Sequence, residues 1–218
     1  RDFCLSRGLG DVYKRQYWVC AVALCKLGAT IIPASLQLTK KDIVYRADSA
    51  RVKAVVCVND EYVCGQMEEA LPESPSIENR IIVAGERDGW TPFDELIEGE
   101  SGEFERPTGE GGVTSKDIML VYFTSGTTGL AKAVCHNFAH PLGHIITAKY
   151  WQQVQENKLH MSVTDSGWAK FGWGKIYGQW IAGATIFAYD MDKFVPTKLL
   201  QKIQDYKLTT FCAPPTMY

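Results

Sequence analysis

The sequence contains no apolar run long enough to cross a membrane. A helix needs about 20 consecutive apolar residues to span the hydrocarbon layer of a bilayer, and no stretch of the 218 residues approaches that length. A basic segment followed by an apolar one, typical of secretory signal peptides, is also missing from the start of the chain. We therefore expect a soluble protein of the cytoplasm.

Excess charge of one sign is also missing. The 23 Lys and Arg residues against 25 Asp and Glu residues give a net charge of -2, which excludes a global field that would attract nucleic acid or an anionic membrane. Any anion site must then be local. Hydrophobic residues make up 46% of the chain, which excludes disorder and indicates a globular protein with a large core.

The seven cysteines include no Cys-x-x-Cys pair, which excludes the common zinc and redox motifs. We interpret most of them as buried, reduced thiols. Cys135 lies near the glycine-rich segment described below, so a nucleophile is the alternative there. A small buried hydrophobe is the preferred interpretation.

The first 16 residues differ from the rest of the chain. RDFCLSRGLGDVYKRQ shows no clear helix or strand period, whereas a helical pattern begins at Tyr17. Its part CLSRGLGDVYKRQ resembles a stretch that recurs at broken ends of proteins predicted from environmental DNA. We predict that residues 1–16 are foreign to the protein and that the chain is an internal fragment. A continuous reading frame through this segment in the intact gene would disprove the first point.

Helix and strand patterns alternate along the chain. Helices are predicted over residues 17–27, 40–50, 61–71, 196–206 and before Trp180, and strands over 29–33, 54–58, 80–84, 118–123, 160–163, 184–189 and 209–212. Thr39, with Asp42 three residues later, is a helix-start signature. Residues 133–150 are predicted to be partly helical, and 85–116 to be a surface excursion that folds locally at 90–97. The pattern predicts an α/β fold with mostly parallel sheets flanked by helices.

A loop rich in hydroxyls and glycines follows the predicted strand 118–123, in the stretch YFTSGTTGLAKAV. Ligands of open α/β sheets bind beyond the carboxyl ends of the strands. The loop offers the hydroxyls of Thr124, Ser125, Thr127 and Thr128, the backbone of Gly126 and Gly129, and the ammonium of Lys132. Converging donors and one cation are what a phosphate requires.

The spacing Gly-x-x-Gly-x-x-Lys, with no Ser or Thr after the lysine, is neither a Walker loop nor a dinucleotide fingerprint. Composition alone leaves two readings open, a phosphate-binding loop and a plain turn with an exposed lysine.

The longer segment YFTSGTTGLAKAVCH resembles the phosphate loop of the AMP-forming adenylating enzymes, which include acyl-CoA synthetases, adenylation domains and luciferases. That pattern has proline where this chain has Ala131, so we expect a slightly more mobile loop. The segments KLGATIIPASLQLTKKDIVYR, TDSGWAKFGWGKIYGQWIAGATIFAYD and TTFCAPPTMY resemble the medium-chain acyl-CoA synthetase branch, so the likeness covers residues 17–218. It implies a partial N-terminal domain of the adenylate-forming fold.

The resemblance also implies a function. Such enzymes use ATP and Mg²⁺ to convert a carboxylic acid, here a fatty acid, into an acyl-adenylate, and then transfer the acyl group to coenzyme A. Trp168 and Gly167 match positions near the bound acid, and residues 124–129 with Lys132 match the nucleotide loop. The family's catalytic lysine lies in a C-terminal domain expected beyond Tyr218, so no catalytic residue is assigned and the fragment alone is expected to be inactive. The oligomeric state stays open.

Two alternatives to a coenzyme A ligase are kept. The chain could belong to an adenylation domain that loads a carrier protein, or to an ATP-binding relative without catalysis, because a fold does not fix a function.

Several conspicuous residues also have simpler explanations. Trp173 and Trp180 are interpreted as core aromatics, and Asp165 as a cap of the helix that follows it. His136, His140 and His144 recur every four residues, as zinc ligands on a helix would. Pro141 and Gly143 interrupt that helix, so no metal site is assigned.

Overall fold

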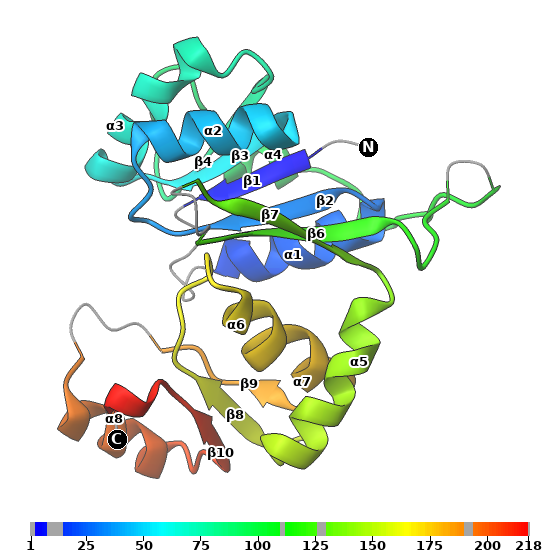
Figure 1. The fold of residues 1–218 in the computed structure, drawn as a ribbon, viewed down its shortest axis with the longest axis vertical. Coiled ribbons are helices and arrows are strands. Elements are labelled where there is room, and N and C mark those ends of the chain that lie inside the picture. Colours follow the sequence, from blue (N-terminus) through cyan, green and yellow to red (C-terminus); the bar gives the residue numbers. More distant parts are fainter. Residues whose placement is uncertain (1–2, 8–14, 110–111, 126–129, 190–193, 218) are drawn as a thin grey trace. The chain divides into compact units, whose positions relative to one another are not determined.

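The computed structural model of the protein describes residues 3–7, 15–109, 112–125, 130–189 and 194–217. The chain forms two compact units, Arg1–Phe138 and Ala139–Tyr218, each with its own sheet (Figure 1). None of the helices in the described ranges has both the length and the apolar character of a membrane span.

A seven-stranded sheet is the framework of the first unit (Figure 1). Its strands are β1 (Phe3–Arg7), β2 (Thr30–Ala34), β3 (Val52–Val58), β4 (Asn79–Val83), β5 (Thr91–Pro92), β6 (Ile118–Thr124) and β7 (Lys132–Asn137). They lie in the order β5-β4-β3-β1-β2-β6-β7. All described pairs are parallel except β6 with β7, so the predicted, mostly parallel α/β fold is confirmed.

Helices cover both faces of this sheet. They are α1 (Arg15–Leu27), α2 (Lys40–Ala50), α3 (Glu61–Ala70) with the 3₁₀ turn η1 (Leu71–Glu73), and α4 (Phe93–Ile97). In Figure 1, α2 and α3 lie on one face and α1 on the other. The α2 helix has the predicted bounds, and the Thr39 backbone N–H donates to the Asp42 carboxylate at its start, at 3.0 Å.

Strand β6 is buried on both faces, as its unbroken apolar sequence predicts. Met119, Leu120, Val121 and Tyr122 are all nearly inaccessible to solvent. The main core of the unit packs α2 and α3 against β2, β3, β4 and β6; its buried members are Ile32, Ala34, Leu38, Ile43, Ala47, Val52, Val55, Cys57, Val58, Val63, Cys64, Met67, Ala70, Ile82, Trp90, Val121 and Phe123. Each fully buried aliphatic side chain contributes about 1.5–3 kcal/mol, so β6 holds a firm position in the sheet.

The excursion between β4 and β6 is fastened to this core at two points. Glu68 on α3 accepts hydrogen bonds from the Arg87 guanidinium and from the Trp90 indole N–H, at 2.6 and 3.1 Å. Val113 packs on Gly28, which ends α1 with φ +76°; a Cβ at Gly28 would lie 2.1 Å from a Val113 methyl group. Only glycine fits both the left-handed backbone and the space.

The second unit has a small parallel sheet of order β10-β8-β9. Its elements are α5 (His140–Ile146), the π-helical turn η3 (Thr147–Trp151), β8 (Leu159–Ser162), α6 (Ala169–Phe171), the π-helical turn η4 (Gly172–Ile176), α7 (Tyr177–Ile181), β9 (Thr185–Ile186), α8 (Pro196–Asp205), β10 (Thr210–Cys212) and the 3₁₀ turn η5 (Pro215–Met217). The predicted strand at 184–189 is shorter than expected.

Two predicted segments differ from the structure. Residues 133–137 form strand β7 and not a helix, because pairing with β6 satisfies their backbone groups; α5 starts at His140, where Pro141 occupies the first turn and breaks no helical hydrogen bond. Near the start of the chain, where no period was recognised, Phe3–Arg7 pair as β1 between β2 and β3, and α1 begins at Arg15. The foreign origin of residues 1–16 stays a prediction.

Candidate functional site

The glycine-rich loop connects two hydrogen-bonded strands. β6 ends at Thr124, β7 begins at Lys132, and these two residues are partners in the antiparallel register. The Thr124 hydroxyl lies 3.5 Å from the Lys132 carbonyl oxygen, to which it donates. The predicted site residues Gly126, Thr127, Thr128 and Gly129 lie outside the described residues.

The described loop residues that carry donors are all exposed to solvent: Thr124, Ser125 and Lys132. They lie at the carboxyl end of β6, whose neighbour β2 runs parallel to it. Two hydroxyls and one ammonium at the carboxyl edge of a parallel sheet provide the donors and the positive charge that an anionic ligand needs.

Helix α2 holds the far end of the loop. The Tyr45 hydroxyl donates to the Ala131 carbonyl at 2.8 Å, and the Tyr45 ring lies edge-on to Phe123, with centroids 6.2 Å apart. The Arg46 guanidinium lies over the same Phe123 ring, 5.0 Å from its centroid. The sequence did not indicate this role for Tyr45 and Arg46, although both end the segment KKDIVYR on which the family resemblance partly rests.

A hollow of about 410 Å³ lies beside the described end of the loop. Its lining residues are Lys40, Lys41, Val44, Tyr45, Glu73 and Leu130. Lys40 forms an ion pair with Glu73 at 2.6 Å, and the hydrogen bond that its ammonium donates to this carboxylate raises the pKa of Lys40. Lys41 is exposed, so the wall next to the loop carries further positive charge.

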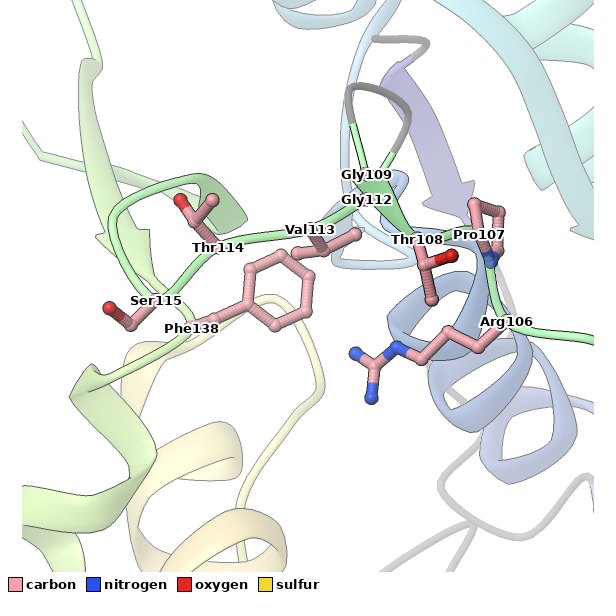
Figure 2. A pocket seen from close by; sticks show the side chains of 9 residues that line it. All are labelled: Arg106, Pro107, Thr108, Gly109, Gly112, Val113, Thr114, Ser115 and Phe138. Atoms are coloured by element: carbon pink, nitrogen blue, oxygen red, sulfur yellow. The ribbon is translucent and has the colours of Figure 1, made fainter.

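Figure 2 shows a larger hollow, of about 540 Å³, in the excursion before β6. The Phe138 ring lies beside Val113, and the other lining residues belong to segments 106–109 and 112–115. Thr114 is already engaged, because its backbone N–H and its hydroxyl both donate to the Asp117 carboxylate, at 2.7 and 2.8 Å. We assign no ligand to this hollow.

Trp168, predicted to lie near the bound acid, is displayed on the surface of the second unit. It follows β8 and occupies the N-cap position of α6, with 69% of its surface exposed. The Asp165 carboxylate accepts from the Gly167 N–H at 2.7 Å, which fixes the turn before the tryptophan. Asp165 therefore holds the turn, and the capping position itself belongs to Trp168.

The predicted core tryptophans have different outcomes. Trp180, on α7, is 37% exposed, so its interpretation as a core residue is wrong. Trp173 is half-buried, and its indole stacks on His144, with centroids 4.7 Å apart and ring planes 9° from parallel.

The three regularly spaced histidines do not share a helix. His136 belongs to β7 in the first unit, whereas His140 and His144 lie on α5 in the second. Burial and the neighbouring His140 lower the pKa of His144. In the part of the chain that the structure describes, no group of three or more His, Cys, Asp and Glu residues could hold a metal ion.

A buried polar cluster in the second unit was not predicted. His160 on β8 faces the Thr210 hydroxyl at 2.9 Å and the Gly174 carbonyl at 3.1 Å. Lys175 on η4 is 2% exposed, with its ammonium 5.4 Å from the centre of the Phe171 ring. Burial lowers the pKa of Lys175 to about 7. A lysine in the segment WGKIYG gives no sequence signal of burial.

Comparison with known protein families decides the membership of the chain. The family model described as AMP-binding enzyme matches residues 14–218. The chain belongs to the AMP-binding enzyme family. The resemblance that the sequence indicated is thereby confirmed.

The curated relatives of this AMP-binding chain are acyl-coenzyme A synthetases. ACSM4 of Rattus norvegicus is 32% identical over 206 residues, and ACSM3 of Homo sapiens is 29% identical over 205; each match covers 93% of this chain and 34% of the relative. The chain therefore spans about a third of the length of these relatives.

Solved structures agree on the fold. The anthranilate CoA ligase AuaEII, solved in complex with anthranoyl-AMP, matches with a TM-score of 0.80 at 19% identity, over 96% of this chain and 39% of that one. The luciferase-like enzyme of the mealworm Zophobas morio matches with a TM-score of 0.76 at 22% identity, over 96% and 46%. The adenylate-forming fold that the sequence predicted is confirmed.

The contact between α2 and the loop of this AMP-binding unit is testable. Tyr45→Phe removes the hydroxyl that donates to the Ala131 carbonyl, and we expect the free energy of unfolding in urea to fall by about 0.5–1.5 kcal/mol. Tyr62→Phe, at an exposed tyrosine on α3, is the matched control. Equal effects of the two substitutions would contradict the assignment.

Proposed function

We propose that the protein to which this AMP-binding chain belongs is an AMP-forming ligase that joins a fatty acid to coenzyme A. In the first step a carboxylate oxygen attacks the α-phosphorus of ATP, and pyrophosphate leaves. In the second step the thiol of coenzyme A attacks the acyl carbonyl, and AMP leaves. The acyl-coenzyme A synthetases among the relatives support this assignment.

The observation that carries the proposal is the position of the loop at the carboxyl end of β6. We propose that Thr124, Ser125, Gly126, Thr127, Thr128 and Gly129 offer hydroxyl and backbone donors to the phosphates, and that Lys132 adds its ammonium. The first step brings two anions together, so donors fixed before the reaction lower its barrier by neutralising charge on the phosphates. Because β6 is buried on both faces, the strand from which the loop starts is held in a fixed position.

Trp168 and Gly167 are the proposed contacts to the acid. An exposed indole provides a large apolar surface for an acyl chain, and a glycine beside it permits close approach of the backbone. The large exposed fraction of Trp168 supports this role, because a tryptophan that only filled the core would be buried.

The proposed co-substrates are ATP and coenzyme A, with Mg²⁺ as the metal ion. The described loop residues supply hydroxyls but no carboxylate, which is the usual protein ligand of Mg²⁺. We therefore derive no step through the ion. Bound to the phosphates of ATP, it would supply further neutralisation of charge.

The cytoplasmic location predicted from the sequence stays part of this proposal. The ACSM relatives from mammals are named as mitochondrial proteins, so the proposed cytoplasmic location differs from theirs and needs a test. Cell fractionation of the intact, tagged protein would decide between the two compartments.

The proposed function is tested on the intact protein expressed from its full gene. We expect octanoate to stimulate exchange of labelled pyrophosphate into ATP, and octanoyl-CoA to form only when coenzyme A is added. If the protein catalysed pyrophosphate exchange and transferred the acyl group to a carrier protein but not to coenzyme A, the carrier protein would be its acceptor. Nucleotide binding with no exchange for any acid would refute the activity.

A further inference from the structure

Two histidines on one face of α5 bring their outer ring nitrogens together. His140 and His144 are four residues apart, so their side chains project from neighbouring turns of the helix. The two Nε2 atoms lie 3.2 Å apart, and the ring planes are inclined by 51°. His140 is exposed and His144 is half-buried, so the pair is accessible from solvent.

The hydrogen bonds of Thr147 determine which nitrogen of His144 carries the proton. The Thr147 hydroxyl donates its single proton to the His144 carbonyl at 2.9 Å. It can then only accept from His144 Nδ1, which lies 3.2 Å away, so Nδ1 carries the hydrogen. The lone pair of a neutral His144 is therefore on Nε2, where it accepts a hydrogen bond from His140 Nε2–H in the ion-free chain. When an ion binds, neutral His140 must carry its hydrogen on Nδ1 so that its Nε2 lone pair is also available. A hydrogen bond from the other ring nitrogen is the usual support of a histidine that binds a metal ion.

Both rings are also held in place by one aromatic side chain. The Trp173 indole stacks on His144 and contacts His140, with centroids 4.7 and 4.5 Å apart. Packing against Trp173 already restricts the rotation of both histidine side chains. Binding a ligand then costs less conformational entropy, so the pair is preorganised.

We propose that His140 and His144 chelate one divalent transition-metal ion through their Nε2 atoms. Metal–nitrogen bonds of about 2.0–2.1 Å at a tetrahedral angle place two imidazole nitrogens about 3.3–3.4 Å apart, close to the distance found here. Imidazole nitrogens favour ions such as Zn²⁺, Ni²⁺ and Cu²⁺, whereas Mg²⁺ prefers oxygen. Water completes the coordination. The site is independent of the proposed ligase activity.

The test is a titration of the full 218-residue chain with NiCl₂, followed by calorimetry and by quenching of tryptophan fluorescence. All samples carry Cys135→Ser, because this thiol is exposed, and not buried as the sequence predicted, and an exposed thiol binds the same ions. We expect one ion per chain, and quenching because Trp173 stacks on a ligand. His140→Gln and His144→Gln should each reduce binding to the level of the double variant, while His136→Gln, on β7, should leave it unchanged.

Two further measurements separate chelation from a structural effect of the substitutions. Thr147→Val keeps both ligands but removes the support of Nδ1, and we expect about tenfold weaker binding. Co²⁺ should give the intense visible absorption of a tetrahedral site with the parent protein and not with His144→Gln. Unchanged Ni²⁺ affinity in His144→Gln, or no binding by the parent below millimolar Ni²⁺, would overturn the proposal.

Discussion

Replacing Lys132 by alanine is expected to weaken ATP binding by about 10- to 150-fold. The ammonium is the one cation of the loop segment 124–132, and a hydrogen bond to a charged partner contributes about 1.5–3 kcal/mol. Lys132 is exposed on β7, so the substitution removes no core contact and should leave the fold intact. Calorimetric titration of the chain with ATP measures the loss.

The control for Lys132 is another exposed lysine of the same unit. Lys116→Ala removes the same charge shortly before β6, away from the loop, and should change the ATP affinity by less than about twofold, as expected for a screened surface charge. Lys132→Arg keeps the charge and should recover part of the binding. If Lys132→Ala and Lys116→Ala bound ATP equally well, the loop would have to be interpreted as a plain turn.

Replacing Lys175 by methionine is expected to stabilise the protein and to remove a pH dependence. The side chain is 2% exposed, and burial lowers its pKa to about 7 from the ordinary lysine value of 10.5. At pH values between about 7 and 10.5, Lys175 carries a proton in the unfolded chain but not in the folded chain. The parent protein is therefore destabilised most below pH 7, and its stability rises with pH by up to about 1.4 kcal/mol per pH unit.

The measurement is urea unfolding at several pH values from neutral to alkaline. Lys175→Met fills the same space without a charge, so near pH 7 we expect it to be more stable than the parent by about 1–4 kcal/mol, with the difference shrinking as the pH rises. Lys198→Met, at an exposed lysine of α8, is the control for a generic loss of charge. A stability difference that is constant with pH would show that folding does not lower the pKa of Lys175.

The predictable parts of the fold are those whose signals are local. Helix α2 has its predicted bounds, because Thr39 and Asp42 mark its start. At its end, Arg51 adopts a left-handed backbone conformation, with φ 48°. The position of the glycine loop after β6 was likewise visible, because a buried strand has an unbroken apolar sequence.

The parts that were missed depend on contacts between distant residues. Residues 133–137 carry no strong strand pattern, and only pairing with β6 makes them a strand. Tyr45 reaches Ala131 across 86 positions of the sequence, so no local pattern could reveal that contact. The burial of Lys175 is of the same kind, because it follows from packing around η4 and not from composition.

The pairing of Thr124 with Lys132 has a consequence for how the loop between them could evolve. The strands already hold both ends of the segment together, so closing it costs little extra conformational entropy. That cost grows only logarithmically with length, and doubling a flexible loop adds about 0.6 kcal/mol. Insertions within residues 125–131 should therefore be tolerated by the fold long before they are tolerated by ligand binding.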